Sequence, residues 1–251
     1  MTSIFTFLFP ILMASTPPPS SHIILNDYNF VAIRTEINFE TVSRAQIEMA
    51  ELVSRRGNKS YVIYLVLDSP GGSITSGLDL IESFQTIPRL ETITLFAASM
   101  ASAIVEALPG QRHILSNGTL MFHRARGSFQ GQFEDGEVES QLAYSKSMVR
   151  KMEVTNSTRM QMSLADYKAA VVNELWLFGA DNVTKKAADD VVTIACTDSI
   201  IVKKEIQTIQ FLGLTMDISL SACPLIKTGT PVDNAQKNLF RDYNKQKGAK
   251  Q

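Results

Sequence analysis

The sequence predicts an α/β fold built on a largely parallel sheet. Segments typical of buried strands alternate with segments of helical periodicity through the first half of the chain. The strand-like segments are 23–34, 61–67 and 92–96, and the helical segments are 39–56, 76–85 and 99–108. Such alternation is typical of βαβ units, whose strands pair in parallel through right-handed crossovers. With 251 residues, 45% of them hydrophobic, the chain is long enough for one large core.

The chain opens with strand, turn, strand and helix. The turn falls at Asn26-Asp27, inside segment 23–34. We expect the apolar face of the helix 39–56 to point largely toward the core, and Gly57-Asn58 to end the helix. The residues of this face are Val42, Ala45, Ile47, Met49, Leu52 and Val53.

The next strand, 61–67, is rich in β-branched and aromatic residues, which predicts burial. It runs into Ser69-Pro70-Gly71-Gly72, a tight turn before the helix 76–85. Two consecutive glycines let the backbone approach a ligand closely and present N–H groups to it. This turn is therefore a candidate ligand-binding loop.

Ser99 lies where the strand 92–96 passes through Ala97 and Ala98 into the helix 99–108. A serine at such a junction is most often an N-cap. Its hydroxyl also lies beside the positive end of the helix dipole, which suits a nucleophile whose attack produces an oxyanion. The junction alone leaves both interpretations open.

His123 strengthens the second interpretation. Segments 112–115 and 119–122 read as short strands joined through Asn117-Gly118, a strong hairpin signal. The second segment ends at His123, 24 residues after Ser99. A lone histidine is usually structural, but this one falls at a predicted strand end, where a general base for Ser99 would stand.

Four motifs then resemble the proteolytic subunit of Clp protease, a self-compartmentalised serine peptidase, in both order and approximate spacing over about residues 24–192. They are Ser-Pro-Gly-Gly-Ser at 69–73, Ala-Ala-Ser-Met-Ala at 97–101, Met-Phe-His-Arg at 121–124 and a Gly-x-x-x-Gly-Gln run at 127–132. The resemblance implies a ClpP/crotonase-type spiral of βαβ units with a protruding handle helix. It also implies Ser99 as nucleophile, His123 as general base, and Gly72 and Met100 as donors of oxyanion-binding N–H groups.

The resemblance further implies an assembly and its partners. Members of this family form heptameric rings stacked face to face, with the active sites inside, and in the cytosol they work with an ATP-driven unfoldase of the AAA+ type. The implied substrates are peptides and unfolded proteins, cleaved through an acyl-enzyme without a metal or organic cofactor. The implied handle is a long helix at about 134–160, whose narrow apolar stripe favours packing against a partner; an ordinary surface helix is the alternative.

The third member of the family's triad is an aspartate, and here the sequence departs from the pattern. Alignment forward from Leu164 places Glu174 at this position, whereas alignment backward from Gly179 places Leu175 there. One inserted residue reconciles the two and favours Glu174, with Asn173 as the fallback. Only Glu174 would stabilise the imidazolium that forms during attack; an exposed helix carboxylate is the alternative.

The sequence leaves three other functions open. Lys146 and Lys151 permit a Ser-Lys dyad like that of signal peptide peptidase A, although the position of His123 favours the triad. A crotonase-like enzyme would use the same fold to bind an acyl-CoA thioester, and the Ser99/His123 pair argues against it. A non-catalytic ring subunit would tolerate the altered acid position.

The sequence predicts four regions: 1–21 as a signal peptide or propeptide with a Pro-rich linker, 22–195 as the peptidase domain, 196–226 as a C-terminal extension, and 227–251 as a polar, disordered tail. The apolar run at 4–13 slightly favours export over the cytoplasm, although no Lys or Arg precedes it. Within the extension, 199–202 and parts of 206–220 read as strands. Nothing in the sequence reaches the length of a membrane span.

The C-terminal part also holds the only two cysteines, Cys196 and Cys223. In an exported protein we expect them to form one disulfide, and in a cytosolic protein to be two buried thiols. Their spacing fits no metal motif. The net charge of −1 gives no footprint for nucleic acid or for an anionic membrane surface.

Overall fold

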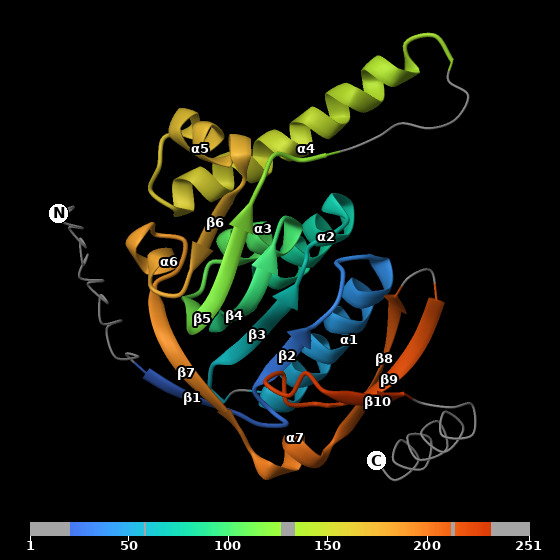
Figure 1. Cartoon of the computed structure of the whole chain (residues 1–251), viewed down its shortest axis with the longest axis vertical. Helices are drawn as coiled ribbons and strands as arrows, with labels where there is room; N and C mark the ends of the chain where they lie inside the picture. Colours follow the sequence, from blue (N-terminus) through green and yellow to red (C-terminus); the bar gives the residue numbers. More distant parts are fainter. Residues whose placement is uncertain (1–20, 58, 127–133, 212–213, 232–251) are drawn as a thin grey trace, which may run out of the picture.

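The computed structural model describes residues 21–57, 59–126, 134–211 and 214–231. Within these ranges, a seven-stranded sheet has the order β1-β7-β5-β4-β3-β2, with β6 paired to β5 (Figure 1). Its strands are β1 (Ser21–Leu25), β2 (Phe30–Ile33), β3 (Ile63–Ser69), β4 (Leu90–Ala98), β5 (Arg112–Phe122), β6 (Leu175–Phe178) and β7 (Asp190–Cys196). Every pairing except that of β5 with β6 is parallel. The predicted α/β fold with a mostly parallel sheet is confirmed.

Helices connect these strands, and a smaller antiparallel sheet follows them. The helices are α1 (Phe39–Arg56), α2 (Ile74–Phe84), α3 (Met100–Ala107), α4 (Glu137–Arg159), α5 (Leu164–Ala170), the 3₁₀ turn η1 (Val171–Asn173), α6 (Asp181–Thr184) and α7 (Asp198–Val202). The smaller sheet comprises β8 (Lys204–Phe211), β9 (Leu214–Ser221) and β10 (Gly229–Pro231).

Helix α1 shows how local signals define an element. Asn38 and Thr41 form a reciprocal capping box that satisfies backbone N–H groups at the helix start. At the other end, Gly57 takes φ +53° and its N–H donates to the carbonyl of Val53. The helix therefore has its predicted bounds, although Ile47 is exposed and does not face the core.

The hairpin predicted at Asn117-Gly118 is wrong. Residues 112–122 form one continuous strand, β5, and both halves of it pair in parallel with β4. The register shifts between Thr94 and Phe96, so the extra residues of β5 form a bulge instead of a turn. A Cβ on Gly118 would lie 2.6 Å from the side chain of Ile114 and 2.8 Å from the carbonyl oxygen of Thr94. The glycine thus permits a close approach of strands, and β5 continues toward His123.

A second prediction, a strand at 199–202, is also wrong, because these residues belong to α7. In a strand, Ile200 and Val202 would lie on the same face. Ile200 is buried but Val202 is exposed, so the two side chains point in different directions, as they do in a helix. The hydroxyl of Ser221 lies within hydrogen-bond distance of the carbonyl oxygens of Ile200 (3.2 Å) and Ile201 (2.7 Å). These bonds satisfy carbonyls that a short helix leaves without partners.

The core has two parts, one on each face of the main sheet. The larger cluster packs α1, α2 and α3 against the sheet and includes Leu65, Phe84, Ile104 and Phe122. The smaller cluster joins Val66 and Ile93 to residues from α7 and the segment after β9. The C-terminal extension therefore covers a face of the sheet that would otherwise expose apolar side chains.

The long helix α4 extends away from the sheet, with its N-terminal end farthest from the body (Figure 1). Of its residues, only Asn156 and Ser157 are buried, both near the C-terminal end. None of the helices in the described ranges combines the length and the apolar character needed to cross a membrane.

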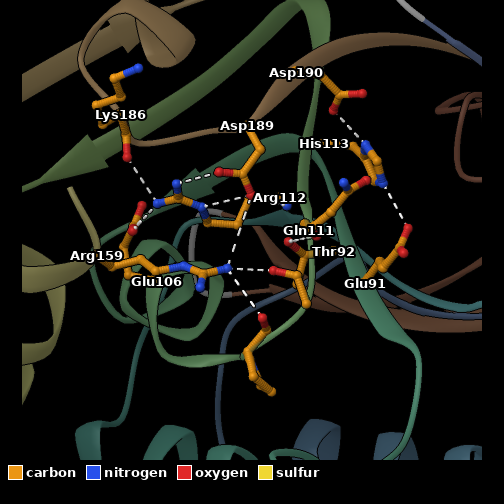
Figure 2. A network of polar contacts seen from close by, with 12 residues as sticks. Glu91, Thr92, Glu106, Gln111, Arg112, His113, Arg159, Lys186, Asp189 and Asp190 are labelled. Carbon is orange, nitrogen blue, oxygen red and sulfur yellow. Dashed lines mark hydrogen bonds and ion pairs between the residues drawn. The ribbon is translucent and has the colours of Figure 1, made fainter. Parts of the chain in front are cut away.

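A buried polar network ties the C-terminal end of α3 to the start of β5 (Figure 2). Arg112 contacts the carboxylate of Glu106 (2.5 Å) and that of Asp189 (2.6 Å), and donates to the carbonyl of Lys186 (2.9 Å). Burial raises the pKa of Glu106 to about 8, against the opposing effect of Arg112. Partial burial acts to raise the pKa of Asp189, but hydrogen bonds from Arg112 hold it below its ordinary value.

The same part of β5 is tied to both neighbouring strands through His113. Its Nδ1 lies 2.5 Å from a carboxylate oxygen of Asp190 on β7, and its Nε2 lies 2.8 Å from one of Glu91 on β4 (Figure 2). Together with the Arg112 contacts, these interactions fix the start of the strand whose other end carries the proposed general base.

Cys196 and Cys223 form a disulfide that links the end of β7 to the C-terminal extension. Arg34 donates to the carbonyls of Ser221 and Ile226, 2.7 Å each, which fastens the extension to the end of β2. Strand β10 shows that the predicted tail is ordered at its start. The rest of the tail and the predicted N-terminal leader lie outside the described residues, and the division into four regions stays a prediction.

Candidate active site

Ser99 has an unusual backbone conformation at the junction of β4 and α3. Its φ is +57° and its ψ is −120°, a region that residues with a side chain rarely adopt and that costs about 1–3 kcal/mol. Its side chain makes no capping hydrogen bond to α3, so the N-cap interpretation has no support in the hydrogen bonding. The strained turn instead leaves the hydroxyl free for another role, while its N–H donates to the carbonyl of Met121 (2.9 Å).

The glycine loop packs directly against this turn. Gly71 has φ +91°, and a Cβ on it would lie 2.8 Å from both the amide nitrogen of Met100 and the Cβ of Ser99. The loop is held in turn by Ile37, whose N–H donates to the carbonyl of Gly71 and whose carbonyl accepts from the N–H of Ser73, 2.7 Å each. Only glycine fits between these two segments of backbone.

Two backbone N–H groups beside Ser99 are available to a ligand. Among the hydrogen bonds of the described residues, none uses the N–H of Gly72 or that of Met100. Met100 is the first residue of α3, where the helix geometry leaves N–H groups without partners. Both residues line the same cavity as Ser99, as an oxyanion hole requires.

This cavity has a volume of about 100 Å³ and brings together four residues predicted from sequence. Ser99, His123, Gly72 and Met100 all line it. Its walls are completed by side chains from α4, α5 and η1 that the sequence does not assign to the site. These include Val149, Met152, Glu153, Asn156, Tyr167 and Val171.

His123 follows β5 directly, beside the buried Phe122. Phe122 packs edge to face against Tyr167, with ring centroids 6.3 Å apart, which holds this end of the strand against α5. The Nδ1 atom of His123 is buried, and within the described part of the chain it has no hydrogen-bond partner. The group that orients the imidazole is therefore not identified by a direct contact.

Glu174, the predicted acid, lies elsewhere. It follows η1 with φ +65°, and its carboxylate accepts hydrogen bonds from Arg126 and from the indole N–H of Trp176, 3.1 Å each. It does not line the cavity of Ser99, and the fallback Asn173 is exposed. The alternative position, Leu175, pairs with Phe122 across β6 and β5. The structure thus does not bring Glu174 to His123, and its assignment stays a prediction.

The lysines of the alternative dyad are also apart from Ser99. Lys146 and Lys151 are exposed on α4, and neither lines the cavity. Lys151 lines a separate hollow with Tyr144 and Met148. The structure therefore gives no support to the Ser-Lys interpretation.

One serine of the site had no signal in the sequence analysis. The hydroxyl of Ser102 lies 2.7 Å from the carbonyl of Ser99 and 2.8 Å from that of Met121. It joins the first turn of α3 to β5, which fixes the position of Ser99 relative to the strand that leads to His123. The only sequence pattern that indicates Ser102 is its position one helical turn after Ser99, in a helix rich in small residues.

The fourth motif of the resemblance, at 127–132, lies outside the described residues. Among the residues that are described, no group of three or more His, Cys, Asp or Glu side chains is placed to hold a metal ion. A protein-family model described as Clp protease matches residues 22–195, which include the strained turn at Ser99 and the whole cavity lining.

Proposed function

Because the chain belongs to the Clp protease family, we propose that it is a serine endopeptidase that hydrolyses peptide bonds through an acyl-enzyme on Ser99. The observation that carries this proposal is the strained turn at Ser99, whose hydroxyl caps no helix and shares a cavity with His123. Backbone strain of this size persists only where the surrounding structure enforces it, and it is common at catalytic residues.

The proposed mechanism uses the residues around the cavity in order. His123 accepts the proton of the Ser99 hydroxyl as the oxygen attacks the carbonyl carbon of the substrate. The N–H groups of Gly72 and Met100 bind the oxyanion of the tetrahedral intermediate. The imidazolium then protonates the departing amine, and a water activated by the same imidazole hydrolyses the ester.

We further propose assembly into heptameric rings, singly or stacked in pairs, with α4 as the contact between rings. The support is the small buried fraction of this helix, because a long helix that packs little against its own body suits a partner. Peptides and unfolded proteins are the proposed substrates. An AAA+ unfoldase is the proposed partner of a cytosolic form, whereas an exported form, without ATP, would act on such chains alone.

The role of Glu174 as triad acid also stays a proposal. It requires the carboxylate to leave Arg126 and Trp176 and to turn toward His123, for instance upon substrate binding or assembly. We expect Glu174→Gln to lower turnover strongly, because a neutral acceptor does not offset the imidazolium charge. If Asn173→Ala lowers turnover instead, the third member of the triad is residue 173 and not residue 174.

The proposal is tested by peptidase assays on the assembled protein. Ser99→Ala should abolish cleavage of fluorogenic peptides, while native mass spectrometry shows the same oligomer as the wild type. The matched control is Ser76→Ala on α2, a serine that does not line the cavity. Activity retained in Ser99→Ala would exclude the proposed mechanism.

A second candidate function is a non-catalytic ring subunit that assembles with an active paralogue. It is favoured by the unpaired Nδ1 of His123 together with the engagement of Glu174 by Arg126. A fluorophosphonate probe separates the two functions, since it labels only an activated serine. Failure to label Ser99 in the assembled protein would support the non-catalytic subunit.

A further inference from the structure

Two buried polar atoms that have no hydrogen-bond partner among the described residues belong to side chains that line the same cavity. One is Nδ1 of His123 and the other is Oδ1 of Asn156, on α4. A buried polar atom left without a hydrogen bond costs about 1–3 kcal/mol, so such atoms in native proteins normally find a partner or a bound water. An imidazole N–H is a donor and an amide oxygen is an acceptor, so the two atoms are chemically complementary.

The orientation of Asn156 is set by its other end. Its side-chain NH₂ donates to the hydroxyl oxygen of Tyr167 at 2.8 Å, and the residue is only 4% exposed. Burial raises the pKa of Tyr167 to about 12, so the phenol stays neutral and keeps this contact over the working range of pH. Because the NH₂ group of Asn156 already donates to Tyr167, the Oδ1 atom is the end of the amide that can accept a hydrogen bond from another group.

The same tyrosine connects this amide to the strand of the histidine. Tyr167 packs against Phe122, the residue immediately before His123. Asn156 and His123 are thus both tied to one aromatic pair, and the cavity that both residues line, at about 100 Å³, has room for a water molecule.

We propose that Asn156 positions the catalytic base while Glu174 is held by Arg126 and Trp176: the Oδ1 of Asn156 accepts the Nδ1 proton of His123, directly or through one water molecule of the cavity. The inference rests on the proposed serine peptidase function and adds a residue to its machinery. With the proton held on Nδ1, the lone pair of Nε2 is available to the hydroxyl of Ser99. Asn156 is a positioning residue, since it acts through His123 and touches no reacting atom.

An amide in this position has a different consequence from a carboxylate. It fixes the tautomer but adds no negative charge beside the imidazolium, whereas an aspartate in the same place would stabilise the charged form of the ring. The charged residues that line the cavity around the imidazole are Arg124, Arg126 and Glu153, and Glu153 pairs with Lys168 at 3.0 Å. None of these changes in the variants below, so a shift in the pH profile reports on residue 156.

The first test measures the rate of fluorophosphonate labelling of Ser99 against pH in two variants. Asn156→Leu keeps the branched shape of the side chain and removes the acceptor, and we expect labelling to slow by roughly 10- to 100-fold at every pH. Asn156→Asp keeps an acceptor and adds charge, and we expect labelling to persist with its pH midpoint moved upward. A wild-type rate and profile in Asn156→Leu would overturn the proposal.

Asn182 provides the matched control. It is a fully buried asparagine on α6 whose Oδ1 also lacks a partner and whose NH₂ donates to the carbonyl of Gly179 (2.9 Å), but it does not line the cavity. Asn182→Leu should label at the wild-type rate. Thermal unfolding of both leucine variants is measured in parallel. It identifies any loss of labelling that comes from an unfolded protein.

A second measurement does not depend on catalysis, and its first result comes from the wild type alone. The chain has three histidines, so ¹⁵N NMR of the histidine-labelled protein, with His123→Ala for assignment, reads the tautomer of His123 directly. We expect the proton on Nδ1 in the wild type and its loss from Nδ1 in Asn156→Leu. A proton on Nε2 in the wild type would overturn the positioning role even if Ser99 proves to be an active nucleophile. If Ser99 fails to label but the proton lies on Nδ1, the peptidase proposal fails and the Asn156 contact stands.

Discussion

The close packing of Gly71 against the Ser99 turn predicts that Gly71→Ala inactivates the protein. A Cβ at residue 71 would lie far inside van der Waals contact with the carbonyl oxygen of Ala98, and 2.8 Å from the amide nitrogen of Met100. Ordinary contacts begin at 3.4 Å, so the glycine loop and the backbone at Met100 must move apart by at least about 0.6 Å. Backbone, unlike the end of a flexible side chain, moves only together with its neighbours, and here those neighbours are Ser99 and the proposed oxyanion hole.

The expected magnitudes follow from this displacement. An alanine at φ +91° costs about 1–2 kcal/mol of folding free energy through its backbone conformation alone. Overpacking adds about 1–3 kcal/mol. A catalytic group displaced by about 1 Å loses on the order of 100-fold in rate. We therefore expect Gly71→Ala to stay folded but to label with fluorophosphonate at least ten times more slowly than the wild type.

Gly136 separates backbone strain from packing. Its φ of +80° is close to that of Gly71, yet a Cβ there would meet nothing within 4 Å. Gly136→Ala should therefore lose about 1–2 kcal/mol in urea unfolding and label at the wild-type rate. If Gly71→Ala also labels at the wild-type rate while folded, then the glycine loop does not hold the nucleophile and the proposed geometry of the site is refuted.

Two further predictions concern stability. Burial raises the pKa of Glu106 to about 8, so the folded state binds a proton that the unfolded state releases, and this contribution to wild-type stability is lost as pH rises from about 5 to about 8. The Glu106→Gln variant lacks this titration. Its unfolding free energy minus that of the wild type should therefore increase by more than about 1.4 kcal/mol between pH 5 and 9. If this difference is the same at both pH values, the burial argument is contradicted. The disulfide between Cys196 and Cys223 should stabilise the chain by about 3–4 kcal/mol in the chain-entropy model. A reductant should therefore lower the unfolding free energy of the wild type. The same reductant should leave the unfolding free energy of the Cys196→Ser/Cys223→Ser variant unchanged.

Elements with local signals were predicted well. Helix α1 begins and ends where its cap residues indicate, because the caps and the apolar face are properties of neighbouring residues. The strand β4 and the start of α3 directly after Ser99 follow from the same kind of signal. Asn117-Gly118 was misinterpreted because the conformational freedom that suits a tight turn also suits a bulge, and only the pairing with β4 distinguishes them.

The candidate site was predicted where it depends on chain order and missed where it depends on packing. Ser99, Gly72 and His123 lie at the ends of strands in one parallel sheet, and such ends meet at one edge. The proposed partner of His123 depends instead on how α4 and α5 pack beside that edge. Asn156 gave no signal, since a polar residue in a helix with a narrow apolar stripe usually faces water, and its burial is decided by Tyr167.

The most direct test of the account is fluorophosphonate labelling of the purified protein, with the modified residue located by mass spectrometry. We expect one label, on Ser99, and its loss in His123→Ala. That result would establish an activated serine that depends on the neighbouring histidine. Absence of label in a folded, assembled wild type, or a label on Ser99 that His123→Ala leaves unchanged, would contradict the central claim that these two residues act together as nucleophile and base.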